Sequence, residues 1–311
     1  MGLPKMLREG AGAVLLFTLL LVLTIYVPII GWVILFVLPI PLTFFTSRFG
    51  WKAGFIVLAC SFFVATFFTP AFSYIFIAGF LLAGVVMGEL LRRRGTFFSL
   101  LLGGTISNIV ILLIGYGIAT KVYKLDIVSW LVSHLTKNFE LTIKMYPTLY
   151  GNTTEQLNLI HQAIIGLGQL IPAFLVILAV FYALLIEIVS GLILRRLRAP
   201  FPKCPPVRNW RFPRNVIWYY FLAVIIMMAG GSVAESSLAM VALNVVVLLE
   251  WVMAIQGLAF IFFYFYQKKK RRFVPILITI FSLLIPPVLY IVRLLGIIDL
   301  GFDLRSRIIR K

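Results

Sequence analysis

Hydrophobic residues in this chain come in runs long enough to cross a bilayer. A helix needs about 20 consecutive apolar residues to span the hydrocarbon core. Such runs, bounded by charged residues or by Pro and Gly, cover residues 11–27, 31–46, 51–69, 71–91, 97–120, 165–194, 216–231, 237–266 and 273–297. The pattern predicts an all-α, polytopic helical membrane protein with about nine hydrophobic helices, of which eight or nine cross completely.

Composition excludes a water-soluble globule. Of the 311 residues, 62% are hydrophobic and 12% are charged, and the mean hydropathy is +1.08. Soluble domains are about half apolar and about a quarter charged. The two cysteines, Cys60 in an apolar run and Cys204 in a basic Pro-rich stretch, predict neither a disulfide framework nor a thiolate metal cluster.

The distribution of Lys and Arg predicts the orientation. With the N-terminus inside, 19 of the 28 basic residues fall on inner segments. These segments are 5–8, 48–52, 92–94, 195–214 and 268–272. The long outer loop 121–164 carries only four. Because cytoplasmic loops are rich in Lys and Arg, we expect a cytoplasmic N-terminus.

The last hydrophobic run conflicts with this rule. Nine full spans would place the basic tail that follows it outside. Pro286-Pro287 interrupts the run, which also contains Arg293. Either the run does not cross completely, or a short basic tail is translocated.

Three regions follow from the order of the spans. Residues 1–194 form a six-span bundle that includes the outer loop 121–164, and residues 215–311 form a three-helix membrane block with a basic tail. The linker 195–214 between them holds five Pro and seven basic residues. Its X-Pro steps favour extended geometry, either as a cytoplasmic strap or as a collar against lipid headgroups.

The outer loop contains an amphipathic segment. Apolar residues recur there at helical spacing: Val128, Leu131, Val132, Leu135 and Phe139. This spacing predicts a helix lying in the outer interface, as a lid over a site or as packing against headgroups. Further along, Thr153 and Gln156 have the spacing of a capping box that starts the next helix.

Catalytic and nucleotide motifs are missing from the sequence. The two histidines, His134 and His161, lie in the outer loop with no HExxH motif or His/Cys cluster. A P-loop and a GxSxG elbow are also absent. We therefore expect no enzyme activity, no metal and no cofactor. The net charge of +18 is explained by loops facing anionic lipid, so we expect no nucleic-acid partner.

A few polar residues lie inside the predicted spans. They are Asn108, Gln169, Glu187, Asn244, Glu250, Gln256 and Arg293. Such residues usually face the bundle interior and mark functional or structural contacts. For Glu187, the plainer interpretation is a place at the inner interface beside Arg195 and Arg196. Asn108 either bonds across a close helix contact or lines a cavity.

A stripe of small residues predicts a close helix contact. Gly79, Ala83, Gly84 and Gly88 form a small-residue stripe, which allows a neighbouring helix to approach closely.

Glu250 and Arg293 are the charges furthest from the inner ends of their spans. By helical rise, Glu250 lies about 27 Å from Lys268 and Arg293 lies about 31 Å from Arg272. Because an unpaired charge at that depth is costly, we expect them to pair across antiparallel helices. The alternative is that Arg293 reaches the outer headgroups alone.

The chain resembles the YybS-like family of bacterial membrane proteins. The segments that carry the resemblance are LPIPLTFFTSRFGWKAG (38–54), AGFLLAGVVMGELLRRRG (78–95), WRFP (210–213) and LGIIDLGFDLR (295–305). This resemblance implies a multi-pass protein of the bacterial cell membrane and assigns no activity.

The first six spans are also similar, more distantly, to the S-components of energy-coupling-factor transporters and to the rod-shape protein MreD. That likeness implies an outward pocket for a small molecule or lipid, and membrane protein partners. Trp32, Tyr74, Tyr116 and Gln169, in the outer halves of their spans, are the candidate ligand-binding residues. The leading hypothesis is therefore a transporter-like binding component, and the alternative is a non-transporting scaffold in cell-envelope assembly.

Overall fold

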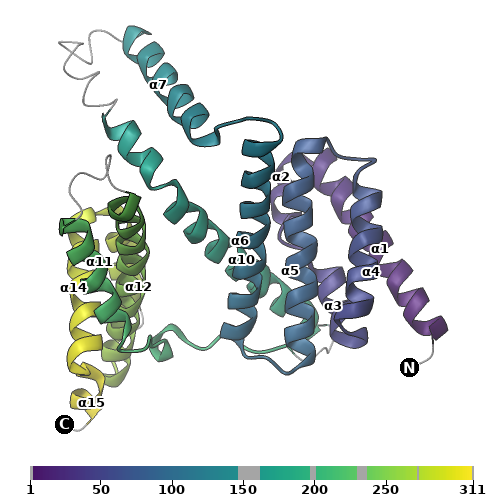
Figure 1. Ribbon diagram of the computed structural model, residues 1–311. Coiled ribbons are helices and arrows are strands. Elements are labelled where there is room, and N and C mark those ends of the chain that lie inside the picture. Colours follow the sequence, from purple (N-terminus) through teal and green to yellow (C-terminus); the bar gives the residue numbers. More distant parts are fainter. Residues whose placement is uncertain (1–2, 146–161, 197–200, 230–236, 272, 310–311) are drawn as a thin grey trace. The chain divides into compact units, whose positions relative to one another are not determined.

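The structure is a computed structural model that describes residues 3–145, 162–196, 201–229, 237–271 and 273–309. Within these ranges the chain forms helices and no strand (Figure 1). Five described helices are long and apolar enough to cross a membrane, or six if one sharply bent pair counts as a single span. The all-helical membrane class is confirmed, whereas the count of nine hydrophobic helices is not.

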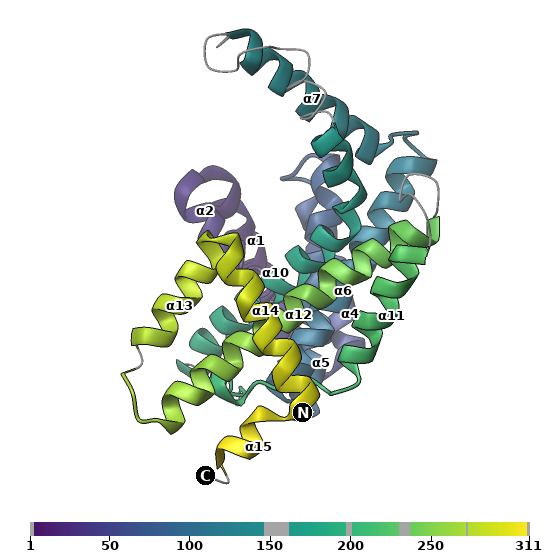
Figure 2. The same ribbon diagram turned by 90° about the vertical axis from the view of Figure 1, so that its left-hand side faces the viewer.

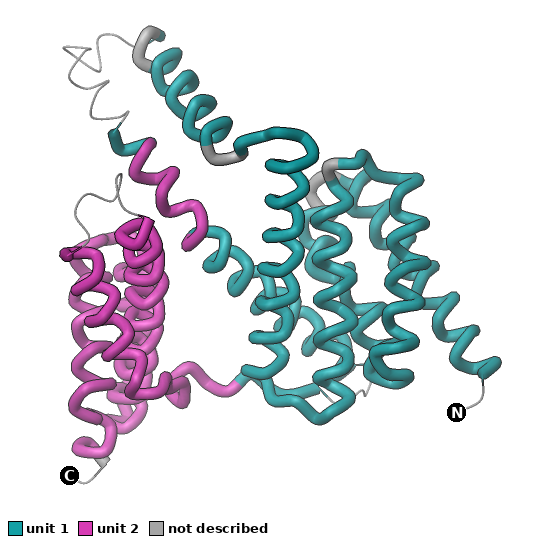
Figure 3. The backbone as a smooth tube through the Cα atoms, in the orientation of Figure 1, with its two compact units in different colours: residues 1–164, 174–204 teal, residues 165–173, 205–311 magenta. Residues whose placement is uncertain are grey.

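The chain divides into two compact units (Figure 3). Unit 1 comprises residues 1–164 and 174–204, and unit 2 comprises residues 165–173 and 205–311. The division falls after Cys204, inside the Pro-rich linker. Residues 205–214 therefore belong with the helices that follow them.

Unit 1 is built from helices that match most of the predicted runs. They are α1 (Leu3–Tyr26), α2 (Pro28–Ile34), α3 (Ile40–Phe49), α4 (Trp51–Ala65), η1 (Ala71–Ser73), α5 (Tyr74–Arg92), α6 (Phe97–Lys121), α7 (Ile127–Met145) and α10 (Ile171–Arg196), whose first three residues belong to unit 2. The run 31–46 is not one helix, because it is broken between α2 and α3. Pro39 and Pro41 stand at that break and, lacking an amide hydrogen, favour the start of a new helix.

Helix α5 is the centre of unit 1 and packs against α3, α4 and α6. Its small-residue stripe faces α3 at two points. A Cβ atom added at Gly84 would lie 2.7 Å from the Pro39 carbonyl oxygen, and one at Gly88 would lie 2.7 Å from that of Thr43. The predicted close helix contact is confirmed, and α3 is its partner.

The first basic segments of the chain meet at one end of unit 1. Glu89 pairs with Arg92 at 2.9 Å and with Arg93 at 2.8 Å. It also accepts a hydrogen bond from the amide of Trp51, at the start of α4. Arg48 pairs with Glu9 of α1. These contacts place residues 9, 48–51 and 89–93 on a common side, as the positive-inside argument requires.

Unit 2 is organised around a long central helix. Its elements are η2 (Val207–Asn209), α11 (Val216–Ala229), α12 (Ser237–Gln267), α13 (Phe273–Leu284), α14 (Pro286–Phe302) and α15 (Leu304–Ile309). Helix α12 packs against α11, α14 and η2.

The last hydrophobic run bends back on itself. Helices α13 and α14 meet at a bend of 118°, visible as a sharp corner in Figure 2. Pro286 and Pro287 occupy the first turn of α14, where two residues without amide hydrogens end the preceding helix. The run is therefore a bent pair and not one straight span.

Helices α12 and α14 meet at several points along their length. Contacts join Glu250 to Arg293, Met253 to Gly296, and Gln256 to Asp299, and Gly257 also meets Val292.

The tail that follows meets the strap of residues 205–214, since Arg305 donates to the carbonyl oxygen of Arg208. The guanidinium of Arg208 in turn lies over the Tyr266 ring near the end of α12. The basic tail thus returns to the side of the preceding basic loop, which removes the conflict with the positive-inside rule.

Two glycines allow α12 and α14 to touch backbone to backbone. A Cβ atom added at Gly257 would overlap the carbonyl oxygen of Val292, and one at Gly296 would overlap that of Met253. In membranes, where lipid tails are as apolar as side chains, such close packing is a main source of helix association.

The bent pair predicts that Lys269 and Arg307 lie on the same side of the membrane. With Cys60 and Cys204 replaced by Ser, single cysteines at positions 269 and 307 should be equally protected from an impermeant maleimide in intact cells. A cysteine at Lys137, in the loop expected outside, should react. Opposite behaviour of positions 269 and 307 would contradict the bent pair.

The backbone contact predicts that alanine is too large at either glycine. Gly257→Ala and Gly296→Ala should each lower the free energy of unfolding in detergent by about 1–3 kcal/mol, as overpacking does. Gly301→Ala on the same helix is the matched control, because a Cβ there meets only Ile217 at an ordinary 3.5 Å. Equal stability of all three variants would show that α12 and α14 do not touch.

Candidate functional site

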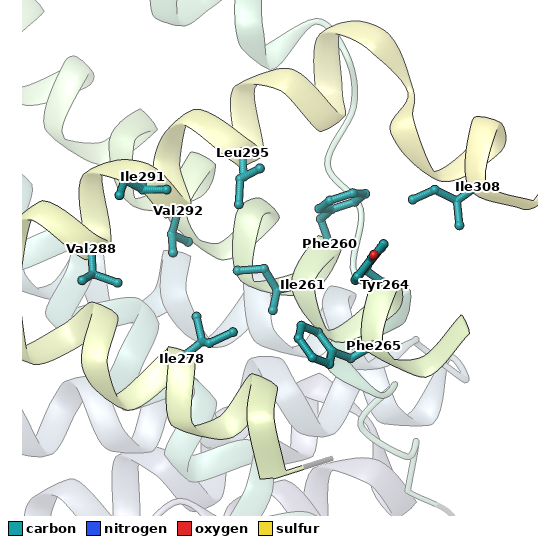
Figure 4. A pocket seen from close by; sticks show the side chains of 10 residues that line it. All are labelled: Phe260, Ile261, Tyr264, Phe265, Ile278, Val288, Ile291, Val292, Leu295 and Ile308. Atoms are coloured by element: carbon teal, nitrogen blue, oxygen red, sulfur yellow. The ribbon is translucent and has the colours of Figure 1, made fainter. Parts of the chain in front are cut away.

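An apolar pocket of about 380 Å³ opens between the helices of unit 2 (Figure 4). Its lining comes from α12, from α13 and α14 on either side of the bend, and from α15. The lining residues are Phe260, Ile261, Tyr264, Phe265, Ile278, Val288, Ile291, Val292, Leu295 and Ile308. Pockets of this volume hold small-molecule ligands, and this one offers only apolar surface.

The pocket has a buried floor and an exposed rim. Phe260, Ile261 and Val292 are buried on the facing sides of α12 and α14. Ile291, by contrast, is 57% exposed and Tyr264 is 37% exposed. The pocket is therefore a groove open on one side, and we call it the unit 2 groove.

The pair predicted between Glu250 and Arg293 is present beyond the floor of the groove. Arg293 Nη1 lies 2.6 Å from Glu250 Oε2, with both side chains less than a third exposed. The two charges come from α12 and α14, which lie on either side of α13 in the chain.

A second polar cluster fixes the other end of the same helices. Asp299 Oδ2 accepts hydrogen bonds from Gln256 Nε2 at 2.6 Å and from Arg305 Nε at 3.0 Å. Asp299 and Gln256 are fully buried, and Arg305 is 6% exposed. A carboxylate and a guanidinium buried together satisfy each other's charge, so this cluster ties α15 to the α12–α14 pair.

The strap of residues 205–214 is held by protein contacts. The amide of Phe212 donates to Gln256 Oε1, and Arg211 and Arg214 both pair with Asp303. Partial burial of Asp303 raises the pKa of its carboxyl, but the two arginines outweigh this effect and hold the pKa below its usual value. Protein contacts therefore hold residues 205–214 against the helices of unit 2.

Asp299, Asp303 and Arg305 were missed as structural residues by the sequence analysis. The signal was present, because two acids and a base stand within seven residues after an apolar run. They were assigned to a tail beyond the last span, where a charge needs no partner. Only the return of α14 to the strap gives them partners.

Asn244 ties a segment of the chain before the linker to unit 2. Its Oδ1 accepts from the amide of Ala173, and its Nδ2 donates to the carbonyl oxygens of Gln169 and Met240, each at 2.9 Å. Residues 165–173 belong to unit 2 for this reason. Asn244 thus has a structural role, and Gln169 contributes its backbone to it.

Glu187 is buried inside the protein. It is 1% exposed, and neither carboxylate oxygen has a hydrogen-bond partner among the described residues. Arg195 Nε donates instead to the carbonyl oxygen of Gly191. Glu187 falls on the inward stripe of α10, next to Ile186, which packs against Met87.

Asn108 lies where the sequence analysis expected a close contact. It is 7% exposed, its Oδ1 faces Gly79 of α5, and its Nδ2 has no partner in the described part of the chain. Gly104, on the same helix, faces Ala183 and Met87. Close packing is thus the observed surrounding of Asn108.

The candidate ligand-binding residues have different environments. In unit 1, Trp32 is 75% exposed and Tyr116 is 45% exposed. Tyr74 packs its ring edge-on against Phe62, and its hydroxyl donates to the carbonyl oxygen of Thr66. Gln169 belongs to unit 2. The unit 2 groove is lined by other residues, so a ligand pocket around these four remains a prediction.

The helix predicted in the outer loop is present as α7. Asp126 caps it by accepting from the amide and hydroxyl of Ser129. Of the predicted apolar face, Val132 and Leu135 are partly buried, while Phe139 is exposed. The capping box at 153–156 and His161 lie outside the described residues.

The Glu250–Arg293 contact can be tested with a double-mutant cycle. Glu250→Gln and Arg293→Gln should each destabilise the protein, and the double variant should lose less than the sum. The coupling should be about 1–3 kcal/mol, because the pair is mostly shielded from water. The exposed pair Glu9 and Arg48 is the control and should couple by less than about 1 kcal/mol. Strictly additive losses for Glu250 and Arg293 would contradict the contact.

Comparison with known proteins agrees with this architecture. The family described as "Predicted membrane protein (DUF2232)" matches residues 15–300. The "Uncharacterized protein YybS" of Bacillus subtilis is 27% identical over 310 residues, which cover 98% of each chain. No solved structure matches. Since the match includes almost every helix described above, this chain belongs to the DUF2232 family of multi-pass membrane proteins.

Proposed function

We propose that the protein is a lipid-binding component of the bacterial cell membrane and that the unit 2 groove holds a hydrocarbon chain of its ligand. The observation that supports the proposal is an apolar groove with a buried floor and an open rim. Its lining suits a chain of methylene groups, because burying each one is favourable by about 0.8 kcal/mol relative to water. A polar metabolite would find no hydrogen-bond partner there.

The groove is supported by contacts that keep it open. The floor is fixed by the close approach at Gly257 and Gly296, and α13, which contributes Ile278 to the wall, meets α14 at a bend of 118°. Ligand sites that are largely formed in advance lose less entropy on binding. The proposed role is therefore binding and presentation of a lipid, without catalysis.

This role is compatible with a part in transport or in envelope assembly. A ligand-carrying subunit of a transporter, with the N-terminus in the cytoplasm, is one form that this role could take. A scaffold without a ligand is the alternative. The two differ in whether a specific lipid stays with the purified protein.

The test is photolabelling with a phospholipid that carries a diazirine in its acyl chain. Label should be found in peptides of α12 and α14 that line the groove. Ile291→Trp should reduce it at least about fivefold by filling the rim. Leu294→Trp is the matched control, because Leu294 is also exposed on α14 and does not line the groove. Equal labelling of both variants would leave the scaffold as the better proposal.

A further inference from the structure

Unit 2 has a marked excess of positive charge beside the groove. Its described carboxylates all have arginine partners: Glu250 pairs with Arg293, Asp299 with Arg305, and Asp303 with Arg211 and Arg214. These pairs neutralise the charges that belong to the fold. The remaining cations near the end of α12 have no carboxylate partner within the part of the chain that the structure describes.

These cations lie close to the groove lining in the sequence, and one of them, Lys270, also lies beside it in space. Lys268, Lys269, Lys270 and Arg271 follow directly after the α12 residues that line the groove, and all four are exposed. The Lys270 ammonium lies 5.9 Å from the ring centre of Phe265, a lining residue. The amide of Lys270 also donates to the carbonyl oxygen of Phe265. This bond ends α12 and keeps Lys270 close to Phe265.

The tail adds a charge at the same end. Arg307 is exposed and directly precedes Ile308, which lines the groove. Helix α15 is held in place because Arg305 is bonded to Asp299 and to the Arg208 carbonyl oxygen. Two separate segments therefore bring cations to one end of an apolar groove. We call Lys268, Lys270 and Arg307 the basic rim.

We propose that the unit 2 groove is a site for an anionic phospholipid, whose acyl chain lies between α12, α13 and α14 and whose phosphate is bound by the basic rim. The assignment rests on the proposed lipid-binding function and adds the class of headgroup. Charge complementarity carries it, because lipid with a net negative headgroup is the partner that supplies a long apolar chain together with an anion. Each Lys or Arg near an anionic membrane surface adds a similar attraction to anionic lipid. Three of them should therefore bind an anionic lipid clearly more tightly than a zwitterionic one.

The experiment compares two photoactivatable lipids with identical diazirine chains, phosphatidylglycerol and phosphatidylcholine, in nanodiscs containing the full-length protein. We expect the phosphatidylglycerol probe to label the groove about tenfold more strongly. The triple variant Lys268→Gln, Lys270→Gln, Arg307→Gln should reduce this ratio to near one without reducing phosphatidylcholine labelling. The variant Lys5→Gln, Lys121→Gln, Lys137→Gln removes the same charge from exposed positions of unit 1 and should leave the ratio unchanged.

The outcomes separate this inference from the proposed function. Equal labelling by both probes in the native protein, or a preference that survives in the rim variant, would overturn the anionic headgroup and leave lipid binding intact. Loss of the preference in both triple variants would mean that general surface charge, and not the rim, selects the lipid. Competition by excess inorganic phosphate would identify a free anion as the occupant. In the Ile291→Trp variant, labelling by both probes should fall together, because that change fills the groove and leaves the rim intact.

Discussion

In unit 2, helices α12 and α14 touch at their backbones, and the other features of this unit follow from that contact. Gly257 and Gly296 permit it, because any Cβ atom at either position would overlap a carbonyl oxygen of the facing helix. Inside a membrane there is little hydrophobic gain from helix association, so close packing and polar pairs have to supply it. The pair Glu250–Arg293 and the Gln256–Asp299–Arg305 cluster add polar contacts between α12 and α14, and the second also ties α15 to them.

The bend between α13 and α14 converts this packing into a site. A straight last span would run antiparallel to α12 and would carry the basic tail to the opposite side. With the bend of 118° at Pro286 and Pro287, α14 turns away from the direction of α13, and the tail after it meets residues 205–214. The space between the three helices becomes the apolar groove, and the tail returns to the basic loop at the end of α12. A single proline step therefore determines the groove, the topology of the tail and the charge at the groove's end.

In unit 1, too, close packing and polar pairs hold the helices together. Its central helix α5 receives α3 along Gly84 and Gly88 and keeps its charged end paired through Glu89. Several polar side chains of unit 1, Glu187 and Asn108 among them, are nevertheless buried with atoms that no described residue satisfies. Polar groups in hydrocarbon are rare and usually functional. Glu187 on α10 and Asn108 on α6 are therefore candidates for a functional role inside unit 1.

The sequence by itself determined the class of the protein, most helix positions, the small-residue stripe and the meeting of Glu250 with Arg293. These features depend on local hydropathy and on the cost of an isolated charge, which are readable residue by residue. Tertiary structure alone decided the break between α2 and α3, the return of α14, the partners of Asp299 and Asp303, and the groove. These depend on which side a helix takes after a proline and on which residues then face it. Hydropathy has the same value for a span that crosses and for one that turns back, so the sequence left that choice open.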